Sequence, residues 1–261
     1  MIASGSPLTS RLTAAGVDWI VPDWPIASPV QALATTRSGG VSSGAHATLN
    51  LGDACGDHPS AVAENRRRVE SFLPSPPVWL RQVHGSKIAQ LDSSTLHAAR
   101  TSAPVADAAV TRERGVVLAV TIADCLPVLC ADRSGRVIGI AHAGWRGLAA
   151  GVIENVVAAM DVASDEITAW LGPAIGPRAF EVGDDVRQAF GGEPMSAFFE
   201  PKHAAKWNAD LYGIGRAKLQ RAGVRSVHGG GYCTFHDAAR FFSYRRDRAT
   251  GHMAAFLWLP P

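Results

Sequence analysis

The chain has 261 residues and a formal net charge of +2 at pH 7. That length suits one large domain and is short for two. Hydrophobic residues make up 47% of the chain and charged residues 18%, which excludes an intrinsically disordered protein and provides for a sizeable core. The nearly neutral charge gives no reason to expect a nucleic acid or a membrane surface as a partner, and we expect a monomer or a small homo-oligomer.

The compartment is predicted from the first residues and the cysteines. Residues 1–16 lack the apolar stretch of a secretory signal, and we expect them to form a loosely ordered arm before a single domain over 17–261. The most apolar segment, 115–123, is too short to cross a bilayer. The cysteines are too few and too irregularly spaced for a secreted disulfide scaffold: Cys55, Cys125, Cys130 and Cys233. We therefore predict a cytoplasmic protein with reduced thiols.

Hydrophobic periodicity predicts strands and helices that are not regularly interleaved. In chain order, strands are expected at 19–21, 32–36, 78–83, 108–111, 116–122, 127–130, 136–141, 167–171 and 253–259. Helices are expected at 59–72, 148–160, 184–190 and 209–221. The strands at 127–130 and 136–141 should form a pair that turns at 132–135. This order favours an α+β fold, a single layered domain with a mixed β-sheet and flanking helices, over a doubly wound sheet.

Three predicted strands end in residues that can bind a metal. His84 ends the strand before Gly85, Cys125 follows an apolar strand just before a proline, and His142 ends the strand before a Gly-rich turn. Strand ends suit such groups because the sheet fixes the backbone while the loop leaves the site open. Two imidazoles and one thiolate are ligands that zinc prefers, and three ligands leave a fourth position open.

The spacing of these three residues matches no short metal motif. A lone histidine at a strand end is more often a hydrogen-bonding structural residue than a ligand, and Cys125 beside an apolar run is more often a small buried hydrophobe. Both interpretations remain open at this point. A closed structural site would need a fourth ligand, which Cys130 could supply from the next strand.

The turn after His142 favours an anion. Gly144 and Gly147 allow a ligand to approach the backbone, and the predicted helix start offers free N–H groups to phosphate. Arg146 opposes the helix dipole in that first turn, which hints at a function, although pairing with a buried carboxylate is an equally good explanation.

Four further polar residues are candidates for catalysis. They lie in Gly-rich turns or next to predicted strands: Arg37, Asp107, Asp124 and Glu181. Asp124 could orient a metal-bound histidine through its second nitrogen or act as a base. Each of these residues is more often a loop cap or a surface charge, so the pattern alone leaves both possibilities open.

Several segments of the chain resemble the YfiH-type, or laccase-domain (polyphenol oxidase), family. The resemblance runs from about Thr35 over nearly the whole chain and is specific as a set. It is carried by TTRSGGVS (35–42), LNLGDACGD (49–57), RQVHG (81–85), ADAAVT (106–111), ADCLPVLCAD (123–132), AHAGWRG (141–147), GPAIGP (172–177), FEVG (180–183) and FFSYRRDRATG (241–251).

The resemblance implies a function and a set of metal ligands. It implies that His84, Cys125 and His142 bind zinc, with copper as the alternative metal. It implies a purine nucleoside phosphorylase that splits adenosine, inosine and methylthioadenosine with phosphate and has adenosine deaminase side activity. An older label for the family is copper-dependent polyphenol oxidase, and some bacterial members are linked to editing of peptidoglycan precursors. The chain departs from many relatives in carrying Ala179 in place of a cysteine and His252 in place of an arginine.

Three alternatives to a zinc phosphorylase remain. A copper polyphenol oxidase needs many histidines, usually in His-x-His pairs, whereas this chain has nine histidines and no such pair. A cysteine hydrolase or amidase would use Cys125 as nucleophile and His84 or His142 as base, without a metal. A non-enzymatic binding module would use the same three residues for a structural zinc and would unfold when the metal is removed.

Overall fold

A six-stranded mixed sheet forms the centre of the fold, in the order β11-β7-β5-β6-β3-β2. The structure is a computed structural model that describes residues 7–26, 29–191 and 194–261. The strands of this sheet are β2 (Ile88–Leu91), β3 (Ala108–Thr111), β5 (Leu126–Asp132), β6 (Ile138–Ala143), β7 (Ile167–Leu171) and β11 (Ser226–Gly229). β5 and β6 are antiparallel, and Pro127 lies opposite His142. The register therefore places the residue before β5, Cys125, at the same sheet end as His142.

Both faces of this sheet are covered, which explains why β5 and β6 are buried along their whole length. Successive side chains of a strand point to opposite faces. Val128 and Cys130 pack in a core with the helices, whereas Leu129 and Ala131 pack in a second core with the other large sheet. A strand that is buried on both faces is continuously apolar and does not alternate.

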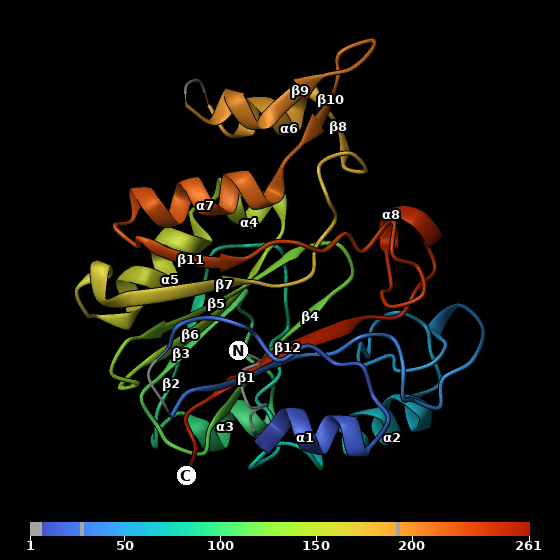
Figure 1. Cartoon of the computed structure of the whole chain (residues 1–261), viewed down its shortest axis with the longest axis vertical. Coiled ribbons are helices and arrows are strands. Elements are labelled where there is room, and N and C mark those ends of the chain that lie inside the picture. The colour runs from blue at the N-terminus through green and yellow to red at the C-terminus, as the bar shows by residue number, and fades with distance from the viewer. Residues whose placement is uncertain (1–6, 27–28, 192–193) are drawn as a thin grey trace, which may run out of the picture.

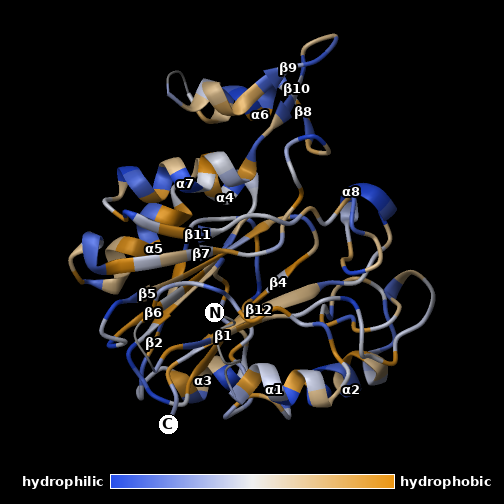
Figure 2. Ribbon diagram, viewed as in Figure 1, coloured by the Kyte–Doolittle hydropathy of each residue, from blue (hydrophilic) through white to orange (hydrophobic). Residues whose placement is uncertain are grey.

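The second sheet has three antiparallel strands in the order β1-β12-β4. These are β1 (Gln31–Ala34), β4 (Val117–Ile122) and β12 (Met253–Trp258). Its far face packs against Leu8 and Leu12 of α1 and Val69 of α2. The molecule is thus layered, with helices on the outside of two stacked sheets (Figure 1). Figure 2 shows hydrophobic residues along the central strands and hydrophilic residues on α8. The structure confirms the predicted α+β fold with a mixed sheet and flanking helices.

Eight α-helices lie in the described part of the chain. They are α1 (Pro7–Ala14), α2 (Pro59–Glu70), α3 (Leu96–Thr101), α4 (Trp145–Ala149), α5 (Val152–Met160), α6 (Asp184–Ala189), α7 (Leu211–Arg221) and α8 (Tyr244–Asp247). Short 3₁₀ turns span Gly44–His46, Ser164–Glu166 and Met195–Phe198. Within the described residues, none of the helices combines the length and the apolar character needed to span a membrane.

A small third sheet stands apart from the two large ones, at the top of Figure 1. Its order is β8-β10-β9, with strands β8 (Glu181–Gly183), β9 (Phe199–Pro201) and β10 (Lys206–Ala209). α6 packs against β8 and β10. Periodicity did not predict these short strands.

The strand predicted at 78–83 is wrong. Only isolated bridges occur there, at Val78 and Arg81. The reason is the Gln82 side chain, which replaces a backbone partner of β4. Its Nε2 donates to Thr121 O at 2.9 Å, and its Oε1 accepts from Thr121 N at 2.7 Å. The strand predicted at 19–21 is likewise reduced to a single bridge between Ile20 and Ala34.

The helix predicted at 148–160 is two helices. α4 begins at Trp145, three residues earlier than predicted, and α5 begins at Val152. The break is at Gly151, whose φ of 86° is in the left-handed region. This backbone conformation costs glycine little, so the chain can turn there between two helical segments.

The arm predicted over residues 1–16 lies partly outside the described residues, which begin at Pro7. Residues 7–14 form α1, and its Leu8 and Leu12 are buried against the second sheet. Over its described part, this segment is therefore a packed helix.

Candidate metal centre and its cavity

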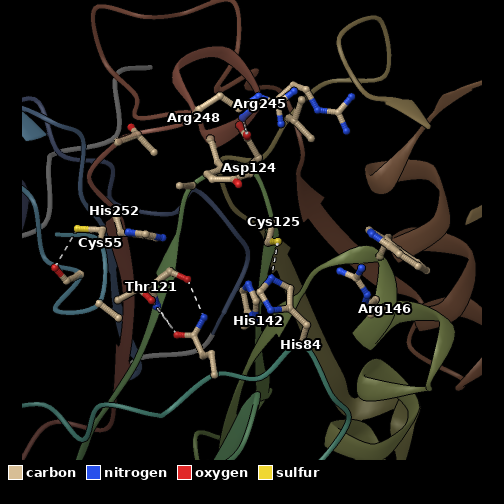
Figure 3. Close-up of a pocket in the computed structure, with 18 of the residues that line it drawn as sticks. Cys55, His84, Thr121, Asp124, Cys125, His142, Arg146, Arg245, Arg248 and His252 are labelled. Carbon is tan, nitrogen blue, oxygen red and sulfur yellow. Dashed lines mark hydrogen bonds between the residues drawn. The ribbon is translucent and has the colours of Figure 1, made fainter. Parts of the chain in front are cut away.

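The residues predicted as metal ligands lie together. One ligand atom from each of His84, Cys125 and His142 falls within 4.8 Å of the others. Cys125 Sγ is 3.8 Å from His84 Nε2, and the two imidazole rings meet edge to face with centroids 4.8 Å apart. Figure 3 shows the three side chains converging on one point of the cavity. The group could hold a metal ion.

Asp107 forms hydrogen bonds to two of these three residues, His84 and His142. Its carboxylate is fully buried. Oδ1 accepts from His84 N at 2.8 Å and from His142 Nδ1 at 2.9 Å. Oδ2 accepts from Val83 N at 3.1 Å and from Gly85 N at 2.7 Å. Burial opposes ionisation, but these hydrogen bonds outweigh it and lower the pKa of Asp107. Asp107 is therefore a positioning residue that leaves His142 Nε2 free to bind a ligand.

The charges of Cys125 and His142 depend on each other. Burial opposes a thiolate, but His142 and His84 outweigh it and lower the pKa of Cys125 to about 6. Burial also opposes an imidazolium, but Cys125 and Asp107 outweigh it and raise the pKa of His142 to about 9. In the metal-free protein the two groups therefore favour an ion pair. A thiolate is the form that a metal binds.

Gly144 provides the space in which these ligands meet. A Cβ atom there would lie 2.8 Å from Cys125 Sγ and 3.1 Å from His84 Cδ2. Its φ of −66° is accessible to any residue, so glycine is required here for space and not for backbone conformation. The donor atoms and this clearance fit a metal ion bound by two nitrogens and one sulfur.

Asp124 anchors the end of β4 to the C-terminal part of the chain. Its Oδ1 accepts from Thr234 Oγ1 at 2.6 Å, and its Oδ2 accepts from Arg245 N at 2.6 Å. Its backbone oxygen accepts from Ile175 N at 2.9 Å. A φ of 100° shows that this backbone conformation is strained for a residue with a Cβ. Both carboxylate oxygens are thus occupied, which suits a positioning residue better than a base.

A cavity of about 790 Å³ opens above the three ligand residues. This volume lies toward the upper end of the ~300–1,000 Å³ typical of small-molecule sites. Its walls carry aromatic side chains from Trp145, Phe180 and Tyr244, and the guanidinium groups of four arginines: Arg81, Arg146, Arg245 and Arg248. The cavity is therefore suited to a planar ligand with negative charge.

Arg146 lies at this cavity beside the ligand residues (Figure 3). Its guanidinium lies over the Trp145 ring, 4.5 Å from the centroid. Arg146 does not pair with a buried carboxylate. Its side chain is exposed and has no ion pair within the described residues. The helix start predicted for phosphate belongs to α4, which has only five residues. The cation of Arg146 is therefore a better anion ligand than that helix terminus.

Arg37 and Glu181 do not line the cavity. Arg37 donates to Ala47 O at 2.9 Å and Ala238 O at 3.1 Å, so it ties two loops together. Glu181, on β8, forms an ion pair with Lys202 at 2.6 Å. Arg37 and Glu181 therefore both lie outside the wall of this cavity. Of the five residues predicted for catalysis, the structure thus places Asp124 and Arg146 at the cavity and Asp107 beneath it.

Sequence reasoning missed most of the far wall of the cavity. Arg81, Arg245 and Arg248 line it without having been predicted. The half-buried His252, which the sequence marks as a departure from many relatives, lines it as well. The available signal was the density of arginines in 245–248, which follows a stretch of aromatic residues. Periodicity carries no information on such a loop, because its residues face the cavity through the tertiary fold.

Known proteins similar to this chain share its length and fold. Residues 31–260 match the family described as "Multi-copper polyphenol oxidoreductase laccase". A purine nucleoside phosphorylase of Pseudomonas aeruginosa is 49% identical over 244 residues, covering 92% of this chain and 98% of that protein. Purine nucleoside phosphorylase YfiH of Escherichia coli is 48% identical over 245 residues, with the same coverage of 92% and 98%.

Solved structures agree with these sequence relatives. A protein of Neisseria meningitidis matches with a TM-score of 0.90 and 46% identity, covering 94% of this chain and 100% of that one. YlmD from Geobacillus stearothermophilus matches with a TM-score of 0.83 and 35% identity, covering 91% and 94%. The resemblance to YfiH-type proteins is confirmed: this chain belongs to the laccase-like family described as multi-copper polyphenol oxidoreductase laccase.

Proposed function

We propose that this protein is a zinc-dependent purine nucleoside phosphorylase. It converts adenosine, inosine or methylthioadenosine and phosphate into the free base and a ribose 1-phosphate, or the methylthio analogue. The observation that supports this most is a three-residue metal centre in an arginine-lined cavity. The names of the relatives in Pseudomonas aeruginosa and Escherichia coli point the same way.

Zinc fits the donor set of His84, Cys125 and His142. It favours nitrogen and sulfur, and a catalytic zinc keeps three protein ligands and one open position. When bound, the ion supplies Lewis-acid charge stabilisation to an oxygen that gains negative charge. Asp107 fixes the tautomer of His142 in advance by accepting from Nδ1.

Phosphorolysis requires an anion to approach the ribose at C1′. The C1′–N9 bond breaks, its electron pair goes to the purine, and the purine takes up a proton. A C1′–O bond forms to phosphate. Arg146, which has no ion pair among the described residues, places its guanidinium at the cavity, and we assign it to the attacking phosphate. The Asp124 carboxylate lines the same cavity and supplies negative charge near the ribosyl cation that develops as the bond breaks.

Deamination of adenosine is the side activity in this proposal. Water replaces the amino group at C6 and ammonia leaves, so inosine is formed and phosphate is not consumed. The same cavity and the same metal centre would serve both reactions. Product analysis separates them, because deamination leaves the glycosidic bond intact.

A cysteine hydrolase is the second candidate, and one specific observation favours it. In the metal-free protein, Cys125, His142 and Asp107 form a thiol, imidazole and carboxylate series, with the pKa of Cys125 lowered to about 6. That arrangement resembles an activated nucleophile, its base and the group that orients the base. Such an enzyme would cleave amides, for example in peptidoglycan precursors. It would be blocked by a thiol alkylator and would survive a chelator.

A copper polyphenol oxidase has less support. Within residues 7–26, 29–191 and 194–261, His84, Cys125 and His142 are the one group of three potential ligands that lie close together. A trinuclear copper cluster with a separate blue-copper site needs several such groups. The metal centre here could bind one copper ion in place of zinc.

The test measures metal content and phosphate-dependent base release in His84→Ala and Cys125→Ala. Both variants should lose bound zinc and nearly all base release while they keep the fold. Cys233→Ala is the matched control, since Cys233 is also half-buried but does not line the cavity. Unchanged turnover in the His84 and Cys125 variants would rule out a metal-centred mechanism.

A further inference from the structure

The cavity wall carries more positive charge than the binding of one phosphate group requires. Four arginines line it, against two carboxylates, Asp53 and Asp124. Asp53 lies 3.3 Å from Arg66, and Asp124 accepts from Thr234 and from the Arg245 backbone. Neither carboxylate therefore neutralises a guanidinium of the cavity wall. In the part of the chain that the structure describes, Arg81, Arg146 and Arg248 have no ion pair.

Three of the four guanidinium groups occupy two separate places. Arg146 follows β6, whereas Arg245 and Arg248 belong to α8 and the turn after it. Figure 3 shows Arg146 on one side of Cys125, and Arg245 and Arg248 on another, beyond Asp124. In each place one guanidinium is held against an aromatic ring, Arg146 over Trp145 and Arg248 over Tyr244, whereas Arg245 donates to Glu181 O. A ring supports the face of a guanidinium and leaves its N–H edge free to donate.

The backbone at Arg248 is strained in a way that favours glycine. Its φ and ψ are 62° and −66°, and Ala249 N donates to Asp247 O at 2.7 Å. These values describe a γ-turn of the rare, strained kind. A residue with a long side chain keeps such a conformation only where the surrounding structure or a function requires it. The side chain at 248 lines the cavity, so a ligand contact would explain the arginine.

We propose that the cavity binds two anionic groups at once, and that its substrates include purine nucleoside 5′-phosphates. This inference rests on the proposed phosphorylase function. Phosphate attacks C1′ from the face of the ribose opposite the base, whereas the 5′ carbon lies on the same face as the base. A 5′-phosphate and the attacking phosphate are therefore kept apart by the sugar. Arg146 binds the attacking phosphate, and Arg248 binds the 5′-phosphate.

The reaction of adenosine 5′-monophosphate balances in the same way as that of adenosine. Inorganic phosphate forms a bond from its oxygen to C1′, and the C1′–N9 bond breaks. The electron pair of that bond goes to adenine, which takes up a proton. The products are adenine and ribose 1,5-bisphosphate.

The test compares kcat/KM for adenosine 5′-monophosphate, adenosine 3′-monophosphate and adenosine, each with inorganic phosphate. The 5′-monophosphate should exceed adenosine by about tenfold, the value of one charge-assisted hydrogen bond. The 3′-monophosphate should show no such advantage, because its phosphate lies on the face that the nucleophile needs. Equal gains for both monophosphates, or none for the 5′ compound, would overturn the inference.

Variants at Arg248 show whether this residue causes the preference for adenosine 5′-monophosphate over adenosine. In Arg248→Gln and in Arg248→Gly, the ratio of kcat/KM for adenosine 5′-monophosphate to kcat/KM for adenosine should fall close to one. Arg248→Gly should also match or exceed the melting temperature of the unsubstituted protein, since glycine relieves the turn. Arg225→Gln is the control, because Arg225 is exposed and outside the cavity. An unchanged ratio in both Arg248 variants would overturn the assignment.

A calorimetric measurement separates this inference from the proposed function. If neither adenosine nor its 5′-monophosphate is split, the phosphorylase proposal fails. Binding of the two compounds to the intact protein then decides by itself whether Arg248 binds a 5′-phosphate. Tighter binding of the 5′-monophosphate that is lost in Arg248→Gln supports this assignment. Equal binding of the two compounds, or tighter binding that Arg248→Gln keeps, overturns it.

Discussion

His142 donates from Nδ1 to Asp107 Oδ1 across 2.9 Å, and the same oxygen accepts the backbone N–H of His84 at 2.8 Å. One buried carboxylate thus positions two of the three proposed metal ligands, although they come from segments far apart in the sequence. The third, Cys125, is placed by the register of β5 against β6. The geometry of the centre therefore depends on Asp107 as much as on the ligands.

Replacement of Asp107 by Asn should damage both stability and metal binding. An amide NH₂ would face backbone N–H groups that now donate to Oδ2, leaving buried donors unpaired at a cost of about 3 kcal/mol. Loss of the group that orients a ligand should weaken zinc binding about 10–100-fold. Urea unfolding and competition with a zinc chelator measure the two effects. Asp165→Asn, at an exposed position, is the control, and equal effects in both variants would contradict the role of Asp107.

Gly144→Ala should disturb the metal centre without straining the backbone. The new Cβ would press on Cys125 Sγ and on the His84 ring, so the ligands must move apart. We expect weaker zinc binding and lower turnover, with the fold kept. Gly231→Ala is a matched control because a Cβ there meets nothing within 4 Å. Normal zinc affinity in Gly144→Ala would show that metal binding does not need the space between Gly144 and Cys125.

Asp132 should make the β5–β6 hairpin sensitive to acid. Its side chain is fully buried, and it accepts from Ser134, from Val137 N and from both the backbone and the side chain of Arg136. Burial opposes ionisation, but these bonds outweigh it and lower the pKa of Asp132 from 3.8. A carboxyl group whose pKa is lower in the folded than in the unfolded protein stabilises the fold at pH values above its unfolded pKa. This stabilisation is lost as the pH falls through the folded pKa.

The corresponding measurement is the free energy of unfolding from neutral pH down to about pH 3. Asp132→Asn should be less stable at neutral pH and should lose less stability on acidification than the unsubstituted protein. Parallel pH curves for the two proteins would contradict the assignment. Asp165→Asn should follow the unsubstituted protein throughout.

Removal of the metal should abolish activity well before it affects the fold. The ligand residues are held by Asp107 and by a sheet buried on both faces, and these contacts do not depend on a metal. A chelator should therefore eliminate base release while the melting temperature changes by only a few degrees. Global unfolding on chelation would favour the structural zinc of a binding module. Amide hydrolysis that survives the chelator but not an alkylator would favour the cysteine hydrolase.

The metal centre could be predicted in part from the sequence, because each of its residues follows an apolar run. His84, Cys125 and His142 each follow such a run, and β5 and β6 were recognisable as a hairpin. Asp107 was a candidate as the acid between two alanines, but its hydrogen bonds depend on how the 83–85 loop folds over it. Local patterns carry no information on a contact of that kind.

Other parts of the fold depend on tertiary contacts that periodicity cannot detect. The segment 78–83 is apolar enough for a strand, yet Gln82 bonds the β4 backbone through its side chain instead. Arg248 contributes to the cavity through an unusual turn, which no propensity predicts. Sequence patterns thus predicted the buried central strands and the β5–β6 end of the sheet, whereas the cavity wall required the structure.

This metal centre should serve phosphorolysis of a purine nucleoside. The most direct measurement incubates zinc-replete protein with adenosine, with and without inorganic phosphate, and identifies the products. We predict adenine and ribose 1-phosphate in equal amounts when phosphate is present, and no adenine without it. Intact adenosine in both samples, or inosine as the sole product whether or not phosphate is present, would contradict the phosphorylase.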